Sequence, residues 1–129
     1  MPSLRVPVLC VLVLAISALG GCGRSVERQA AAMTGGEPAR GKGLVRRYGC
    51  VSCHAIPGVP GVAGQGTIGP SLEGIAGKDT LAGKLPNEPK NMIRWIRDPQ
   101  GLQPGSAMPD MDIAEQDGRD IAAFLYTLR

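Results

Sequence analysis

The chain begins with its longest apolar stretch and then becomes polar. Arg5 precedes the run VPVLCVLVLAISAL at residues 6–19, which has the length of a signal-peptide core and is shorter than a comfortable membrane span. The pattern predicts an exported protein with a signal peptide over residues 1–21. Cys10 lies inside the run, and we interpret it as a small hydrophobic residue.

The apolar run ends in Leu19-Gly20-Gly21-Cys22, which resembles a bacterial lipobox. This resemblance implies that Cys22 is lipidated and becomes the mature N-terminus. Ordinary cleavage nearby and an uncleaved anchor helix are the alternatives. Residues 22–38 are polar and rich in alanine, and we predict a flexible tether here, because a short helix at residues 26–33 would have little apolar face to bury.

Apolar residues with helical spacing predict three helices in the rest of the chain, over residues 39–48, 91–98 and about 112–128. Pro99 stops the second helix, and Asp112 with Glu115 forms a capping box for the third. No strand pattern of any length accompanies them. The domain is therefore predicted to be mostly α.

The sharpest chemical signal is the stretch Cys50-Val51-Ser52-Cys53-His54. Covalent attachment of c-type haem would use all three reactive side chains, two thiols for the vinyl groups and the imidazole for iron. A redox dithiol would not require His54, and a Cys50–Cys53 disulfide would leave that histidine without a role. A zinc site lacks ligands, because the other thiols are Cys10 and Cys22 and there is one histidine. The motif favours haem.

Composition agrees with a small domain built around a bulky group. The 129 residues form one domain, and an aromatic content of 3% is little material for a core, so a buried macrocycle would supply apolar bulk. The 19 glycines and 11 prolines predict short helices and long loops. A formal charge of +3 is too small to indicate nucleic-acid binding.

Further segments follow CVSCH in a fixed order: GPSL at 69–72, GK at 77–78, WIRDP at 95–99, PGSAMP at 104–109 and DIAAFLYTL at 120–128. The series resembles class I c-type cytochromes from about residue 40 to residue 129. Residues 85–111 are also similar to the cytochrome c domains fused to subunit II of some bacterial terminal oxidases. The resemblance implies an all-α domain over residues 39–129, with short helices and long loops around one covalent haem.

The same resemblance assigns roles to individual residues. Cys50 and Cys53 would form the thioethers, His54 and Met108 would ligate iron, and the carbonyl of Pro70 would accept the imidazole N–H. One match concerns the fold: Gly41 is the small residue that the last helix crosses, with Ile121 and Phe124 at the crossing positions of that helix. Two matches concern the haem: Trp95 is a haem-facing aromatic residue, and Lys78 is a basic residue near a propionate.

Several of these assignments have rivals. Met111 competes with Met108, although Pro104, Gly105 and Pro109 keep Met108 out of a helix. Trp95 would be buried in any helical domain, and Lys78 would serve equally as a solvated loop charge. Asn87 or Lys84 are alternative propionate partners, and Met92 is assigned to the core.

The predicted helix over residues 39–48 also carries a group of basic side chains. They form either a docking face or solvated helix charges: Arg40, Lys42, Arg46 and Arg47.

A haem with His and Met ligands has no vacant iron position and passes electrons. The sequence therefore predicts an exported, lipid-anchored monohaem electron carrier of a respiratory chain, in the bacterial cell envelope with its haem in the periplasm. Its partners would be redox proteins such as a terminal oxidase or a dehydrogenase, with no small-molecule substrate of its own. The alternatives are a haem-bearing subunit of such an enzyme complex, and a gas sensor in which Met108 yields to a diatomic ligand.

Overall fold

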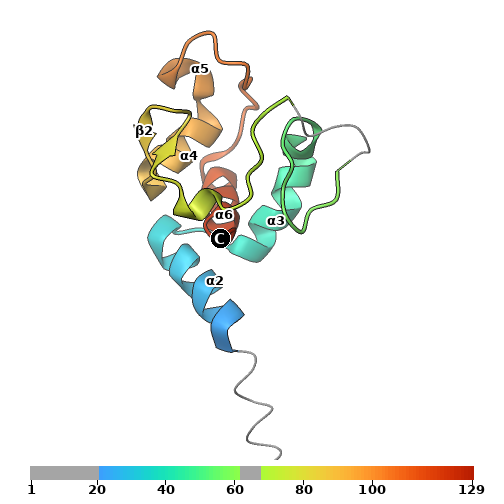
Figure 1. The fold of residues 1–129 in the computed structure, drawn as a ribbon, viewed down its shortest axis with the longest axis vertical. Helices are drawn as coiled ribbons and strands as arrows, with labels where there is room; N and C mark the ends of the chain where they lie inside the picture. The colour runs from blue at the N-terminus through green and yellow to red at the C-terminus, as the bar shows by residue number, and fades with distance from the viewer. Residues whose placement is uncertain (1–20, 62–67) are drawn as a thin grey trace, which may run out of the picture.

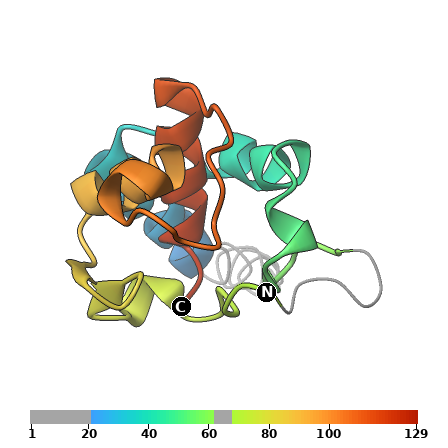
Figure 2. The ribbon, with the colours of Figure 1, turned by 90° about the horizontal axis from the view of Figure 1, so that it is seen from above.

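The last helix of the chain runs through the middle of the molecule (Figure 1 and Figure 2). The computed structural model describes residues 21–61 and 68–129. Cys10 and the predicted signal peptide, apart from Gly21, lie outside the described residues. The same holds for the centre of the loop between His54 and Pro70.

The described elements follow in the order α2 (Gly21–Thr34), α3 (Pro38–Arg47), η1 (Cys50–Ser52), η2 (Ile75–Gly77), β1 (Thr80–Leu81), β2 (Leu85–Pro86), α4 (Pro89–Arg97), α5 (Pro99–Leu102) and α6 (Glu115–Leu125). Helices α2, α3 and α4 all pack against α6, whose residues from Asp120 to Leu125 are buried. Their apolar side chains join those of α6 in one core, which includes Met92 as predicted. The mostly helical architecture predicted from the sequence is confirmed.

Helices α3 and α6 cross with their backbones in contact at Gly41. A Cβ atom placed on Gly41 would overlap the carbonyl of Asp120, so no residue larger than glycine fits without moving one helix. Val45, one turn further along α3, and Ile121 of α6 are both almost fully buried beside this crossing. The predicted role of Gly41 as the small residue at a helix crossing is confirmed.

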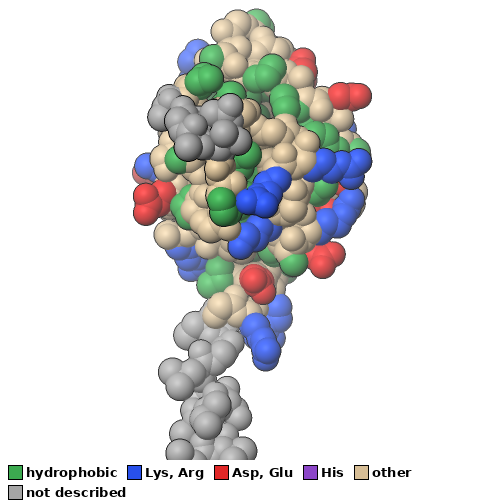
Figure 3. Space-filling view, turned by 90° about the vertical axis from the view of Figure 1, so that its right-hand side faces the viewer, with side chains coloured by type: hydrophobic (Ala, Val, Ile, Leu, Met, Phe, Trp, Pro, Cys, Tyr) green, Lys and Arg blue, Asp and Glu red, His purple; other side chains and the backbone are tan. Residues whose placement is uncertain are grey.

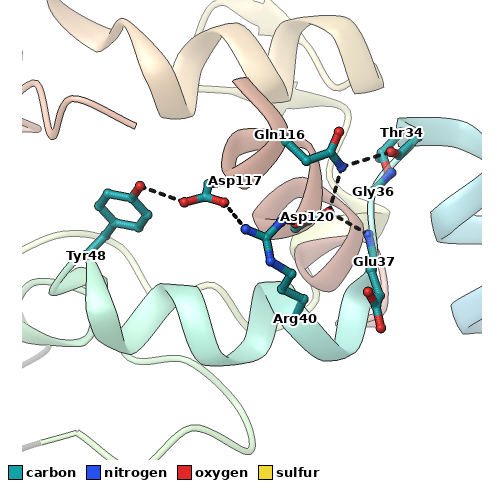
Figure 4. A network of polar contacts seen from close by, with 9 residues as sticks. Thr34, Gly36, Glu37, Arg40, Tyr48, Gln116, Asp117 and Asp120 are labelled. Atoms are coloured by element: carbon teal, nitrogen blue, oxygen red, sulfur yellow. Dashed lines mark hydrogen bonds and ion pairs between the residues drawn. The ribbon is translucent and has the colours of Figure 1, made fainter. Parts of the chain in front are cut away.

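Two buried carboxylates of α6 connect it to α3 (Figure 4). Asp117 and Asp120 both pair with the guanidinium of Arg40, and Asp120 Oδ1 also accepts a hydrogen bond from the backbone N–H of Glu37 at 2.8 Å. The Tyr48 hydroxyl donates to Asp117 Oδ2 at 2.8 Å. Buried charge is tolerated where it is paired and hydrogen-bonded, and each of these carboxylates has at least two partners.

The hydrogen bond between Tyr48 and Asp117 affects both groups. It holds the pKa of Asp117 below its usual value of 3.8, assisted by the charge of Arg40 and opposed by burial. The contribution of Asp117 to stability is therefore present above its usual pKa and lost as pH falls through its folded value. The same bond, with burial, raises the pKa of Tyr48 above 10.0, so the stability from Tyr48 is lost only as pH rises through that raised value.

The N-terminal segment is helical, and the prediction of a flexible tether over residues 22–38 is wrong for the described part. Helix α2 lies on α6 through small side chains: Ala30 and Thr34 are each 2% exposed. The Thr34 hydroxyl donates to the Ala30 carbonyl at 2.9 Å and accepts from Gly36 N–H at 3.1 Å, which closes the end of the helix. Alanines allow two helices to approach closely, so a narrow apolar face is enough.

Helix boundaries near the C-terminus differ from the prediction in two places. Pro99 ends α4 as expected but also begins the short helix α5. The predicted capping box of Asp112 and Glu115 does not form: α6 begins at Glu115 with Ala114 as its N-cap and no side-chain cap. Asp112 has a positive φ of 49°, so its backbone turns the chain ahead of the helix.

Between η2 and α4 the chain forms one small antiparallel hairpin. Thr80 pairs with Pro86 and Leu81 with Leu85. Positive φ angles of 48° at Ala82 and 72° at Gly83 make the tight turn. Two-residue strands are too short to leave an alternating pattern in the sequence, and none was predicted.

We predict that Gly41→Ala destabilises the holo-protein by about 3 kcal/mol, because the added methyl group forces α3 away from α6. Gly43→Ala is the matched control in the same helix, since a Cβ at Gly43 meets nothing within 4 Å. Alanine there should stabilise the helix by about 0.5–1 kcal/mol. Denaturant unfolding followed by circular dichroism measures both changes, and equal effects of the two substitutions would contradict the tight crossing.

Candidate functional site

The Cys50–His54 motif occupies one tight turn directly after α3. Gly49, with a positive φ of 74°, ends the helical path and starts the 3₁₀ turn η1. The Cys50 carbonyl accepts from Cys53 N–H at 3.2 Å and from His54 N–H at 2.9 Å, so both thiols and the imidazole come from a single hydrogen-bonded loop. Cys50 and Cys53 are free thiols and half-buried. Burial raises the pKa of the Cys50 thiol, which keeps it protonated.

The imidazole of His54 has a fixed orientation. Its Nδ1 lies 2.7 Å from the carbonyl oxygen of Pro70. A carbonyl only accepts hydrogen bonds, so Nδ1 carries a proton, and in the neutral ring Nε2 then has the free lone pair. The structure thus contains the contact that the sequence resemblance implied, and it leaves the second ring nitrogen available as a metal ligand.

Two backbone hydrogen bonds bring the Pro70 segment against the motif. Gly69 N–H donates to the Cys53 carbonyl at 2.8 Å, and Leu72 N–H donates to the Ala55 carbonyl at 2.9 Å. A Cβ on Gly69 would overlap the His54 ring. A side chain at position 69 would therefore have to displace the imidazole, and glycine permits this close approach.

Several apolar side chains of the domain are only partly covered, as a site for a large apolar group requires. Ile68, beside Gly69, is 74% exposed. Trp95 on α4 is half-buried. Further partly buried apolar residues pack against the edge of the core, among them Val51, Leu72, Ile75, Leu85 and Ile93. With two free thiols and an oriented imidazole, these residues fit a covalently bound c-type haem.

Met108 and Met111 lie on the same irregular segment in different settings. Both are half-buried, but Met111 packs against the core, whereas Met108 does not belong to that cluster. The backbone N–H of Met108 donates to the Ser106 hydroxyl at 3.2 Å. The structure therefore gives Met111 a packing role and leaves the thioether of Met108 as the better candidate ligand.

Lys78 and Asn87, the residues considered as propionate partners, are bonded to each other through the Lys78 backbone. Lys78 is exposed, and its carbonyl accepts from the Asn87 side chain at 2.7 Å. Asn87 uses its other amide hydrogen on the Ile75 carbonyl at 2.8 Å, and its oxygen accepts from the Tyr126 hydroxyl at 2.9 Å. Asn87 therefore has no hydrogen left to donate to a propionate, and it serves to fasten the 75–87 segment to the end of the chain. Burial, with the nearby charge of Glu88, raises the pKa of Tyr126 to about 12.

Lys and Arg side chains gather on the face that α3 presents to solvent (Figure 3). Lys42 and Arg47 are exposed there, and the Arg46 guanidinium donates to the Pro60 carbonyl at 3.1 Å. Arg40 differs, because its guanidinium is engaged by Asp117 and Asp120. Sequence reasoning had grouped it with the surface charges and missed this structural role.

A cleft of about 430 Å³ lies between α2, η2 and the end of the chain, away from the thiols and the imidazole. Ala30, Met33, Tyr126 and Arg129 are among its lining residues. Within residues 21–61 and 68–129, no three His, Cys, Asp or Glu side chains form a group that could hold a metal ion. In the same part of the chain, no helix has the length and apolarity needed to cross a membrane.

Comparison with known proteins covers the domain that contains this motif. The family model described as Cytochrome c matches residues 38–129. Cytochrome c oxidase subunit 2 of Alkalihalophilus pseudofirmus is 33% identical over 91 residues, covering 70% of this chain and 25% of that protein. The proteins of the same name from Bacillus sp. strain PS3 and Bacillus subtilis are 30% and 28% identical, over 46% and 54% of this chain and 17% and 19% of theirs. The chain thus spans a quarter or less of these relatives. No solved structure matches significantly.

We predict that Gly69→Ala lowers the free energy of unfolding of the holo-protein by about 1–3 kcal/mol, because the methyl group displaces the His54 ring from Pro70. Gly77→Ala is the control, since a Cβ there meets nothing within 4 Å and the residue does not have positive φ. Denaturant unfolding followed at the haem absorbance band measures the change. If both variants unfold like the wild type, Gly69 does not constrain the imidazole.

Proposed function

Because the chain belongs to the cytochrome c family, as a class I c-type cytochrome related to oxidase subunit II, we propose that it carries single electrons in a respiratory chain through a haem ligated by His54 and Met108. It is exported and held at a membrane by a lipid on Cys22, with its haem domain in the periplasm. Its redox partners are a terminal oxidase or a dehydrogenase.

The observation that carries this proposal is the orientation of His54. The bond from Nδ1 to the Pro70 carbonyl leaves Nε2 as the ring nitrogen that would ligate iron and would increase its basicity, and Cys50 and Cys53 would hold the porphyrin by thioethers. When bound, a c-type haem supplies a one-electron iron couple. Met108 would complete the ligand set, and a thioether favours the reduced state. The oriented imidazole and the two thioethers would limit rearrangement between the two oxidation states.

The respiratory setting is supported by the relatives named as cytochrome c oxidase subunit 2. Those relatives also favour the second candidate, a haem-bearing subunit that remains bound to an oxidase or dehydrogenase. Purification from native membranes separates the two. A larger subunit that co-elutes at constant ratio favours the complex, and elution as a single chain favours the free carrier.

We predict that Met108→Ala lowers the reduction potential by on the order of 0.1 V, because the iron loses its thioether. The near-infrared sulfur-to-iron absorption band should disappear, and the ferrous protein should bind carbon monoxide while the haem stays covalently attached. Met111→Ala is the control and should change none of these properties. Loss of the band in Met111→Ala alone would reassign the ligand. A wild-type protein that lacks the band and binds carbon monoxide readily would favour the gas sensor.

We predict that Cys22→Ser abolishes incorporation of labelled fatty acid and releases the protein from the membrane fraction, because the thiol is the acylation site. Expression in a bacterial host with a radioactive fatty acid gives the measurement, with Cys50→Ser as the thiol control that retains the label. Equal labelling of wild type and Cys22→Ser would remove the lipid anchor from the proposal and leave the electron carrier intact.

A further inference from the structure

The side chain of Gln100 lies at the centre of the turn that carries Met108. Its Nε2 donates to the carbonyl of Ser106 at 2.8 Å and to the carbonyl of Met108 at 2.7 Å. Its Oε1 accepts from Gly105 N–H at 3.2 Å. The partners fix which end of the amide is which, because carbonyls only accept and an N–H only donates. Both amide hydrogens are therefore used on this one turn.

Hydrogen bonds order the backbone on either side of Gln100. It belongs to the short helix α5, in which the Asp98 carboxylate accepts from Gly101 N–H at 2.8 Å and the Pro99 carbonyl accepts from Gln103 N–H at 2.8 Å. A Cβ on Gly101 would overlap the Asp98 carboxylate, so the cap depends on this glycine. The buried ring of Pro99 seats the helix against the rest of the domain.

The segment around Met108 has few other connections. Within the described part of the chain, few hydrogen bonds connect residues 104–110 to other residues. They are the bonds of the Gln100 side chain and one from Ser106 N–H to the Gln103 carbonyl at 3.0 Å. The backbone here is irregular, and Gly105 has a positive φ of 82°. Gln100 therefore supplies most of the hydrogen bonding that orders this turn.

We propose that Gln100 is a positioning residue for the distal ligand: it fixes the backbone of Met108 so that the thioether stays on iron. This inference rests on the proposed function, because it assumes ligation by Met108. A thioether is a weak neutral ligand, so the sulfur-bound state depends on how much loop freedom must be lost to form it. Removal of the amide should shift the balance between sulfur-bound and sulfur-free iron by roughly tenfold or more, the equivalent of one or two neutral hydrogen bonds.

The test compares Gln100→Ala and Gln100→Glu with the control Gln103→Ala, each as holo-protein. Gln100→Glu keeps the shape of the side chain but turns a carboxylate toward two carbonyls, so a space-filling role would survive it. In the described part of the chain, the side chain of Gln103 makes no hydrogen bond, although its backbone shares the same turn. The measurements are the intensity of the near-infrared sulfur-to-iron band and the rate of carbon monoxide binding to ferrous haem, which scales with the sulfur-free fraction.

Both Gln100 variants should weaken the band and bind carbon monoxide about tenfold faster than the wild type. Gln103→Ala should match the wild type. Unchanged band and rate in the Gln100 variants overturn the inference, as does an equal effect of Gln103→Ala. If Gln100→Ala does not accumulate as holo-protein, Gln100→Glu decides by the same criteria. A wild type without the band overturns ligation by Met108 and this inference with it, whereas a wild type with the band leaves the proposed function standing whatever the variants show.

Discussion

The close contact of α3 and α6 at Gly41 is the constraint on which the rest of the geometry depends. Helix α3 delivers the chain to Gly49 and the thiols, and α4 and α5 deliver it to Met108. The thiol-bearing segment and the Met108 segment are far apart in sequence and do not need to contact each other directly. Each follows a helix that packs against α6, α3 for the thiols and α4 for Met108. A small change in the distance between α3 and α6 would therefore move His54 relative to Met108.

Polar interactions make this crossing specific. Apolar packing alone would allow α3 to slide along α6, since van der Waals contact has little directionality. The paired carboxylates of Asp117 and Asp120 accept bonds from Arg40, Tyr48 and the Glu37 backbone, which together fix translation and rotation. These partners offset the cost of burying the two charges, and they also fix the position of α3 relative to α6.

The sequence was sufficient to predict the family and most of the helices. The spacing of Cys50, Cys53 and His54 is specific in itself, and the ordered segments after it, as far as the terminal helix, indicated both the family and the Gly41 crossing. The boundaries of α4 were predicted within two residues. The start of α6 was missed because Asp112 has the residue type of a cap but a positive φ, and the conformation of a single residue leaves no pattern.

Other features could not be predicted because they depend on side chains that bond to backbone far away in the fold. Asn87 and Gln100 are ordinary polar residues in the sequence, and neither follows a periodic pattern. Their roles appear only when the carbonyls they bind are brought within reach by tertiary structure. The same limit applies to α2, whose contact with α6 uses alanine and threonine instead of large apolar residues.

The helical state of α2 changes what an anchor at its start would do. Its 14 residues span about 21 Å as a helix, close to the average reach of a flexible chain of the same length. A helical and a flexible segment would thus hold the domain at nearly the same distance from a bilayer. They would differ in how freely the domain can rotate. A domain on a flexible chain tumbles independently of its anchor, whereas one held through a helix packed on α6 moves with that helix as one body. Encounters with a membrane-embedded partner would then combine lateral diffusion of the anchor with pivoting of helix and domain together.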